Sequence, residues 1–260
     1  MPGIDLGTSL GGLSVAVHHA PSSRGIAVLI PGFLDSKDYA SSVALARKLT
    51  TIGITAVRFD PRGTWQSGDC PADCTTTQQI HDVTAILDSV SRIGHDRRIL
   101  IGYCYGAYVA ALSAAFDERV TEVVAIMPTH SFIWAEDYNE EKDTWRFDGE
   151  RCYVRDLPAS AGSATVHVPY SVVEDAKGHL IADVWEKLHQ PILFVAGEGD
   201  SLSTPDGVRV LHAKCGSQRK NLAVLPGVSH DYRYDARQIE RVDRAVLEWL
   251  LKQPSAMGGK

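Results

Sequence analysis

The chain has 260 residues, of which 44% are hydrophobic, and this is enough to build a large core. Its formal net charge is −6 and its 26 lysines and arginines are scattered, which disfavours nucleic acid and anionic membranes as partners. The sequence begins without a signal-peptide pattern, and no apolar run is long enough to span a bilayer. We therefore expect a globular cytoplasmic protein, and five cysteines without an export signal favour reduced thiols.

Short β-branched runs alternate with longer amphipathic stretches along most of the chain. This rhythm is typical of parallel strands joined by crossover helices, so it predicts an α/β fold with a mostly parallel sheet. Before residue 129 we expect strands at 13–20, 25–30, 54–60, 97–104 and 120–128, and helices at 36–53, 76–94 and 105–116, the first with Ser36 as a possible N-cap. After residue 188 we expect strands at 191–200 and 220–227 and helices at 205–216 and 235–253.

The rhythm breaks between about residues 129 and 188, where aromatic and charged residues mix with weak periodicity. We therefore expect residues 1–128 and 189–260 to form one core and residues 129–188 to be an insertion. Its aromatic residues could wall an apolar pocket or could form the insertion's own core: Phe132, Trp134, Tyr138, Trp145, Phe147, Tyr153 and Tyr170.

The segment Gly102-Tyr103-Cys104-Tyr105-Gly106 fits the pattern of a nucleophile held in a strained turn between a strand and a helix. Side chains at the two glycine positions would collide with neighbouring backbone, and the turn exposes the central side chain at the edge of the sheet. The N-terminus of the following helix favours an anion, which suits a thiolate nucleophile. The alternative is a buried structural cysteine between two glycines.

Two partners for Cys104 follow it, each after a predicted strand: Asp200 in "FVAGEGDSLSTP" and His230 in "LPGVSHDYR". Nucleophile, acid and histidine in this order suit a site in which the histidine takes the proton and the acid orients the ring. Asp200 could instead cap the next helix, and His230 could be an ordinary surface residue. Glu198 and Asp206 are alternative acids, and His130 is a further histidine at a strand end.

An acyl-transfer site also needs hydrogen-bond donors for an oxyanion. The backbone N–H groups of Tyr105, at the helix start, and of Phe33, in the loop "LIPGFLDS", are the candidates, although "PGF" could be an ordinary turn. Cys70 and Cys74 are separated by three residues and lack a second ligand pair at zinc spacing. No glycine motif for a nucleotide is present, so we expect no cofactor and no metal.

The "PGF" loop, the segment "FDPRGTWQSG", the elbow around Cys104, Asp200 and His230 stand in the order found in the α/β-hydrolase superfamily. The chain resembles that superfamily over nearly its full length. Most members have serine at the elbow, whereas "GYCYGA" is similar to the elbow of dienelactone hydrolases, which use a Cys-His-Asp triad. The insertion resembles the lids of esterases, thioesterases and C–C hydrolases, and the resemblance implies that it follows the sixth strand and covers the nucleophile.

These features predict a cofactor-independent hydrolase or acyltransferase in which Cys104, His230 and Asp200 process an ester or thioester through an acyl-cysteine. The substrate would be a small molecule or a carrier-bound acyl chain that the enzyme releases or cyclises. One alternative is a lactone hydrolase similar to dienelactone hydrolases. Another is a non-catalytic protein that binds a small molecule on the same scaffold.

Overall fold

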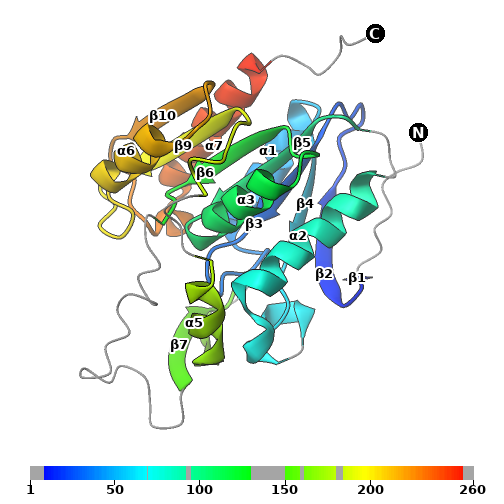
Figure 1. The fold of residues 1–260 in the computed structure, drawn as a ribbon, viewed down its shortest axis with the longest axis vertical. Helices are drawn as coiled ribbons and strands as arrows, with labels where there is room; N and C mark the ends of the chain where they lie inside the picture. Colours follow the sequence, from blue (N-terminus) through cyan, green and yellow to red (C-terminus); the bar gives the residue numbers. More distant parts are fainter. Residues whose placement is uncertain are drawn as a thin grey trace.

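The computed structural model describes residues 9–68, 70–91, 95–129, 150–158, 161–179 and 184–253. These residues contain an eight-stranded sheet in the order β1-β2-β4-β3-β5-β6-β9-β10 (Figure 1). Strand β2 pairs antiparallel with β1 and β4, and every other pairing in the sheet is parallel. The strands are β1 (Ser9–Leu10), β2 (Leu13–His18), β3 (Ile26–Ile30), β4 (Thr55–Phe59), β5 (Arg98–Tyr103), β6 (Glu122–Ile126), β9 (Ile192–Gly197) and β10 (Lys220–Leu225).

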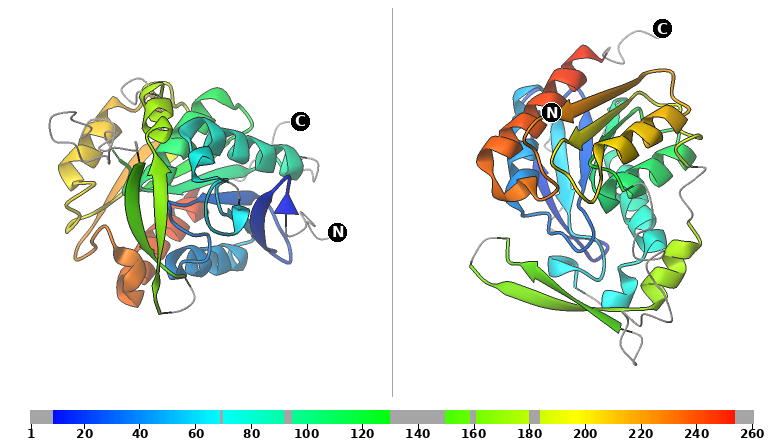
Figure 2. Two further views of the ribbon diagram at one scale, coloured as in Figure 1. Left: turned by 90° about the horizontal axis from the view of Figure 1, so that it is seen from below. Right: turned by 90° about the vertical axis from the view of Figure 1, so that its left-hand side faces the viewer.

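Helices cover both faces of this sheet, as Figure 2 shows. On one face lie α1 (Ala40–Thr51) and α7 (Ala236–Lys252). On the other lie α2 (Thr76–Ser91), α3 (Tyr105–Phe116) and α6 (Pro205–Lys214). Every residue of β3 is buried, because alternate side chains of a strand point to opposite faces and both faces are covered. The predicted α/β fold is therefore confirmed.

The start of α1 differs from the sequence-based expectation. The helix begins at Ala40, with Tyr39 at the N-cap position, so the prediction that Ser36 caps it was wrong. The Ser36 hydroxyl instead donates to Asp60 Oδ1 at 3.3 Å and accepts from the Asp38 N–H at 3.2 Å. The Ser36 carbonyl accepts the Tyr39 N–H at 3.2 Å, so the chain makes a turn here before it enters the helix.

The described part of the predicted insertion contains a second sheet and a short helix. Strands β7 (Glu150–Asp156) and β8 (Ser163–Pro169) make an antiparallel hairpin separate from the large sheet, and α5 (Ser171–Lys177) follows it (Figure 2). Its buried side chains Val168 and Val172 pack with Leu34 and Cys74 of the core. The outer limits of the insertion stay a prediction, and six residues of interest lie outside the described ranges: His130, Phe132, Trp134, Tyr138, Trp145 and Phe147.

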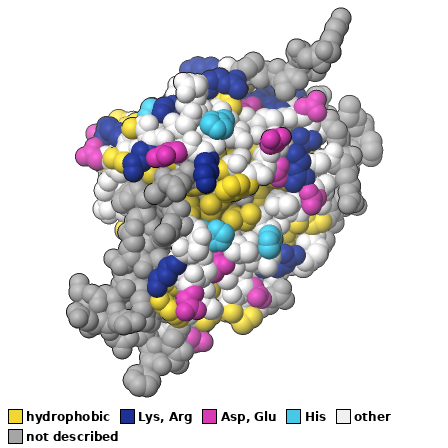
Figure 3. Space-filling model, viewed as in Figure 1, with side chains coloured by type: hydrophobic (Ala, Val, Ile, Leu, Met, Phe, Trp, Pro, Cys, Tyr) yellow, Lys and Arg dark blue, Asp and Glu magenta, His cyan; other side chains and the backbone are white. Residues whose placement is uncertain are grey.

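The surface carries charges of both signs. On the face drawn in Figure 3, basic and acidic side chains of the described residues are interspersed. Within the described ranges, no helix is both long enough and apolar enough to cross a membrane. The expected location in the cytoplasm stays a prediction.

Candidate active site

Cys104 occupies the turn between β5 and α3, with φ 52° and ψ −116°. The two flanking glycines are required by space. A Cβ on Gly102 would lie 2.1 Å from the carbonyl oxygen of Gly106, and a Cβ on Gly106 would lie 2.3 Å from that of Ile30. No side chain fits at such distances, so the strand, turn and helix can approach this closely only with glycine at both positions. The half-buried Cys104 stands at the apex of this turn.

Asp200 and His230 meet at the same edge of the sheet, after β9 and β10. His230 Nδ1 lies 2.8 Å from Asp200 Oδ2. The other carboxylate oxygen, Oδ1, accepts the backbone N–H groups of Leu202 and Ser203, each at 2.8 Å. Because the carboxylate is only 3% exposed and both oxygens are engaged, its orientation toward the histidine is fixed.

The imidazole of His230 interacts with the cysteine as well as with this carboxylate, since both groups act on its pKa. Burial lowers the pKa of His230, but hydrogen bonds and charge from Asp200 and Cys104 outweigh it and raise the pKa from 6.5 to about 10. With Nδ1 facing Asp200, Nε2 is the nitrogen available to exchange a proton with the thiol. The structure thus brings His230 and Asp200 into direct contact, and Cys104 acts on the same imidazole; their joint role as a catalytic triad stays a prediction.

The alternative acids lie elsewhere. Glu198 is exposed, and the Asp206 side chain is 93% exposed and pairs with Arg209 at 2.8 Å. The side chain that caps α6 is that of Thr204, whose hydroxyl accepts the Gly207 N–H. Asp200 therefore does not cap this helix.

Phe33 lies in the loop of residues 31–35, which follows β3. Because Phe33 is a predicted oxyanion donor, this loop is called the oxyanion loop below. The loop is a turn, in which the Asp35 N–H donates to the Gly32 carbonyl at 3.0 Å. The Phe33 ring meets the Tyr105 ring edge to face, with 5.9 Å between the centroids. The structure thus places the Phe33 ring beside that of Tyr105, the first residue of α3, and the role of the two backbone N–H groups as oxyanion donors stays a prediction.

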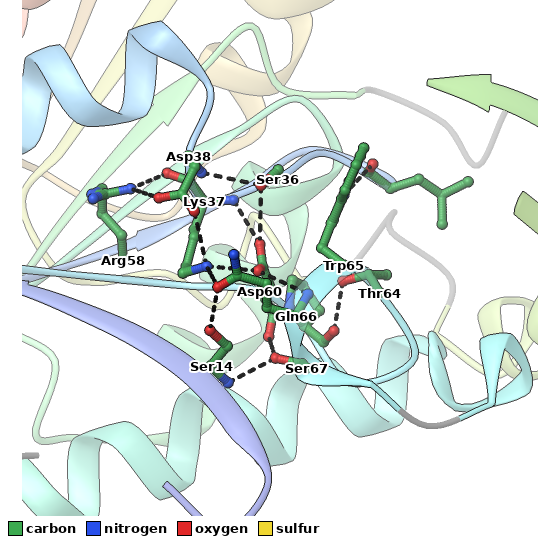
Figure 4. Close-up of polar contacts among 12 residues, drawn as sticks. Ser14, Ser36, Lys37, Asp38, Arg58, Asp60, Thr64, Trp65, Gln66 and Ser67 are labelled. Atoms are coloured by element: carbon green, nitrogen blue, oxygen red, sulfur yellow. Dashed lines mark hydrogen bonds and ion pairs between the residues drawn. The ribbon is translucent and has the colours of Figure 1, made fainter. Parts of the chain in front are cut away.

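A buried polar network holds the oxyanion loop against the loop that follows β4 (Figure 4). Its centre is Lys37, which is 4% exposed. The Lys37 ammonium contacts three side-chain oxygens: Asp60 Oδ2 at 2.9 Å, Asp38 Oδ2 at 3.0 Å and Gln66 Oε1 at 2.8 Å. The Trp65 indole N–H adds a hydrogen bond to the Leu34 carbonyl at 2.9 Å. Lys37 gave no signal in the sequence, because it is an isolated lysine inside a predicted helix.

The hairpin β7–β8 also touches the oxyanion loop. Arg155 Nη2 donates to the Phe33 carbonyl at 3.1 Å, and the Tyr153 ring lies 5.3 Å from the Phe33 ring. The Tyr39 hydroxyl donates to the Asp156 carbonyl at 2.8 Å. The sequence analysis missed Arg155, since nothing in an irregular segment indicates which loop of the core it contacts. In the part of the chain that the structure describes, no three His, Cys, Asp or Glu side chains are grouped to hold a metal ion.

Comparisons with known proteins agree with this architecture. Over 127 residues the chain is 34% identical to a polyketide transferase, grgF, from a Penicillium species, and the match covers 46% of this chain and 43% of that protein. The match thus spans less than half the length of this curated relative.

Solved structures are similar over a larger part of the chain. The crystal structure of the alpha/beta hydrolase GrgF from Penicillium sp. sh18 is 20% identical, has a TM-score of 0.70, and covers 92% of this chain and 93% of its own. Est1E from Butyrivibrio proteoclasticus, with ferulic acid bound, is 22% identical, has a TM-score of 0.73, and covers 93% of this chain and 95% of its own. These likenesses show the fold.

A sequence model of the alpha/beta hydrolase family matches residues 27–245. The matched region extends from β3 into α7, so it spans the elbow, the residues after β9 and β10, and the predicted insertion. The chain belongs to the alpha/beta hydrolase family.

Proposed function

We propose that this protein is an acyl-transfer enzyme that acts on esters or thioesters through an acyl-Cys104 intermediate. The observation that carries the proposal is the succession of side chains at the elbow. Cys104 stands in the strained turn and acts on the pKa of His230, whose Nδ1 lies 2.8 Å from the buried Asp200. A nucleophile, a base and an acid that orients the base are the parts that covalent acyl transfer requires.

In the first step, His230 Nε2 takes the thiol proton and Cys104 Sγ attacks the acyl carbon. A sulfur–carbon bond forms, and the carbonyl electron pair moves onto the oxygen. When this oxyanion collapses, the bond to the leaving alcohol or thiol breaks, and the leaving group receives the proton from His230. In the second step, water or another acceptor attacks the thioester, His230 takes the acceptor's proton and returns it to the released Sγ.

Electrostatics supports each step. The raised pKa of His230 makes its imidazole a stronger acceptor for the thiol proton, and Asp200 stabilises the charge that then forms on the ring. For the oxyanion we propose the backbone N–H groups of Phe33 and Tyr105 as donors. The N-terminus of α3 adds its dipole at the same place.

We further propose that the hairpin β7–β8 and α5 belong to a lid over this site. The hairpin contacts Phe33 through Tyr153 and Arg155, so an acyl group that reaches Cys104 would pass beside it. The polyketide transferase among the relatives supports transfer to an acceptor other than water. The ferulic acid bound to Est1E supports an aromatic or apolar acyl group.

Mass spectrometry of the intact protein tests the proposal. The full chain is mixed with p-nitrophenyl esters, N-acetylcysteamine thioesters and a five-membered enol lactone, and is quenched within the first turnovers. We expect a mass increase equal to one acyl group, located on Cys104 by peptide mapping. Cys104→Ala should form no adduct and lose about 10³-fold or more in turnover.

The control is Cys70→Ala, which removes an exposed thiol outside the site and should retain both adduct and turnover. Absence of any adduct on the wild type, together with equal turnover in Cys104→Ala, would contradict the proposal. Ligand binding without turnover by the wild type would favour the non-catalytic binding protein.

A further inference from the structure

We propose that Tyr103 is a positioning residue, which uses its hydroxyl to hold the backbone of His230 and its ring to set the distance between the histidine and the oxyanion loop. The inference rests on the proposed function and extends it by one residue. Tyr103 is the last residue of β5 and directly precedes Cys104.

The hydroxyl contact joins the elbow to the loop of residues 226–231, called the histidine loop below. Tyr103 OH donates to the His230 carbonyl oxygen at 2.7 Å. The Tyr103 ring also packs beside the His230 ring, with 5.4 Å between centroids, and lies at the same distance from the Tyr232 ring. The residue before the nucleophile therefore fixes both the backbone and the ring of the base.

The same ring borders the oxyanion loop. A Cβ built on Gly32 would lie 3.1 Å from Tyr103 Cδ1, so the ring packs directly against the residue before Phe33. Nearby, Arg233 Nη1 lies 3.3 Å from Asp35 Oδ2 and ties the turn after the histidine loop to the oxyanion loop. Tyr103 thus touches two loops that the proposed reaction must hold in register, the histidine loop and the oxyanion loop.

The protonation of Tyr103 suits this role. Burial, and next the neighbouring Cys104 charge, raise the pKa of Tyr103 well above its usual value of 10. The hydroxyl therefore keeps its proton and can donate to the His230 carbonyl throughout the working range of pH. The contact does not depend on the protonation cycle of the reaction.

Removing only the hydroxyl tests the inference. In Tyr103→Phe the ring still fills its place, but the His230 carbonyl loses its donor and the histidine loop is free to shift. A displacement of about 1 Å can slow a reaction about a hundredfold, so we expect acylation of Cys104 to slow by about tenfold to a hundredfold. We also expect the pKa of His230 to fall below its value in the wild type, because its interactions with Asp200 and Cys104, which raise it, weaken.

Tyr108→Phe is the matched control. Tyr108 is a buried tyrosine of α3 whose hydroxyl also donates to a histidine carbonyl, that of His179, outside the proposed site. Three quantities are measured for both variants: the single-turnover rate of acylation, the pH at which the His230 imidazole titrates by NMR, and stability in urea. We expect comparable losses of stability, with slower acylation and a shifted titration only in Tyr103→Phe.

Wild-type acylation and an unchanged His230 titration in Tyr103→Phe would overturn the inference. Equal slowing in both variants, with the His230 titration unmoved, would also overturn it, since that pattern indicates a general loss of stability. Failure of the proposed function is separable, because it is read from turnover in Cys104→Ala. The NMR titration reports on Tyr103 even if no substrate is turned over.

Discussion

Cys104 holds a backbone conformation that costs a non-glycine residue about 1–2 kcal/mol. Its φ of 52° persists because the surrounding backbone fixes both of its peptide groups. The Cys104 N–H donates to the Ile126 carbonyl at 2.9 Å, and the Cys104 carbonyl accepts the Ala107 N–H at 3.1 Å. The strain thus falls on the residue that we propose as the nucleophile. Its hydrogen bonds to the neighbouring strand and helix offset the energetic cost of this conformation.

The close approach of backbone at the elbow leads to a prediction for stability. In Gly106→Ala the new Cβ would lie 2.3 Å from the carbonyl oxygens of Ile30 and Pro31, so β3 and α3 must separate. We expect the free energy of unfolding to fall by about 3 kcal/mol or more, measured in urea. The control Gly199→Ala places its Cβ 3.4 Å from the Val228 carbonyl and should change stability little. Wild-type stability of Gly106→Ala would contradict this geometry.

A second prediction concerns the charge of Asp200. In Asp200→Asn the side-chain oxygen can still accept the N–H groups of Leu202 and Ser203, but the carboxylate facing His230 is lost. We expect kcat to fall by about 10³-fold to 10⁴-fold, because the ring loses its orientation and its stabilising charge. The thermal midpoint should change much less. The control is Asp206→Asn, at an exposed carboxylate, and equal kcat values for the two variants would speak against the role of Asp200.

At the scale of elements, the sequence predicted most accurately the strand and the helix that hold Cys104. The expected helix at 105–116 matches α3, and the strand before Cys104 was expected to begin one residue earlier than β5 does. Both were predictable because a buried run, two glycines and an alanine-rich stretch each have a local physical cause. The hairpin β7–β8 was not predictable, since its side chains alternate only weakly between buried and exposed and Val154 is 64% exposed. Its partners are loops of the core, which leave no periodic pattern.

The network between the loops after β3 and β4 gives a prediction at this scale. Lys37→Met would leave the fully buried Asp60 without its cation. Breaking a buried pair on one side costs about 3–5 kcal/mol, so we expect a loss of this size in the free energy of unfolding in urea. Lys252→Met, at an exposed lysine near the end of α7, should change it by less than about 0.5 kcal/mol. A loss for Lys37→Met as small as that of the control would mean that the network does not stabilise the oxyanion loop.

In the whole molecule, the proposed site is assembled from residues far apart in the chain. Phe33, Cys104, Asp200 and His230 each follow a different strand, and parallel pairing of β3, β5, β6, β9 and β10 brings those strand ends to one edge. Strand ends and family order were enough to predict that Asp200 and His230 meet. The contacts of Tyr103 and Arg155 depend on how loops pack, so they could be read only from the structure.

The attachment of the insertion to the core yields a prediction for dynamics. Thr77, at the start of α2, bonds Asp175 of α5 through its hydroxyl at 2.6 Å and its backbone N–H at 3.0 Å. In Thr77→Val the hydroxyl contact is lost, and we expect amide hydrogen exchange in residues 171–177 to rise about tenfold. Thr84→Val removes a hydroxyl that bonds only its own helix, to the Ile80 carbonyl at 2.9 Å, and should leave this exchange unchanged. Equal exchange in both variants would show that this contact does not anchor α5.

The alkylation rate of Cys104 tests the coupling of sulfur and imidazole most directly. Wild type and His230→Ala are treated with iodoacetamide at neutral pH, and mass spectrometry follows Cys104 and the exposed Cys70 in the same molecule. We predict that Cys104 reacts at least about tenfold faster than Cys70 in the wild type, and that this advantage disappears in His230→Ala. Equal rates for Cys104 in the two proteins would contradict the account.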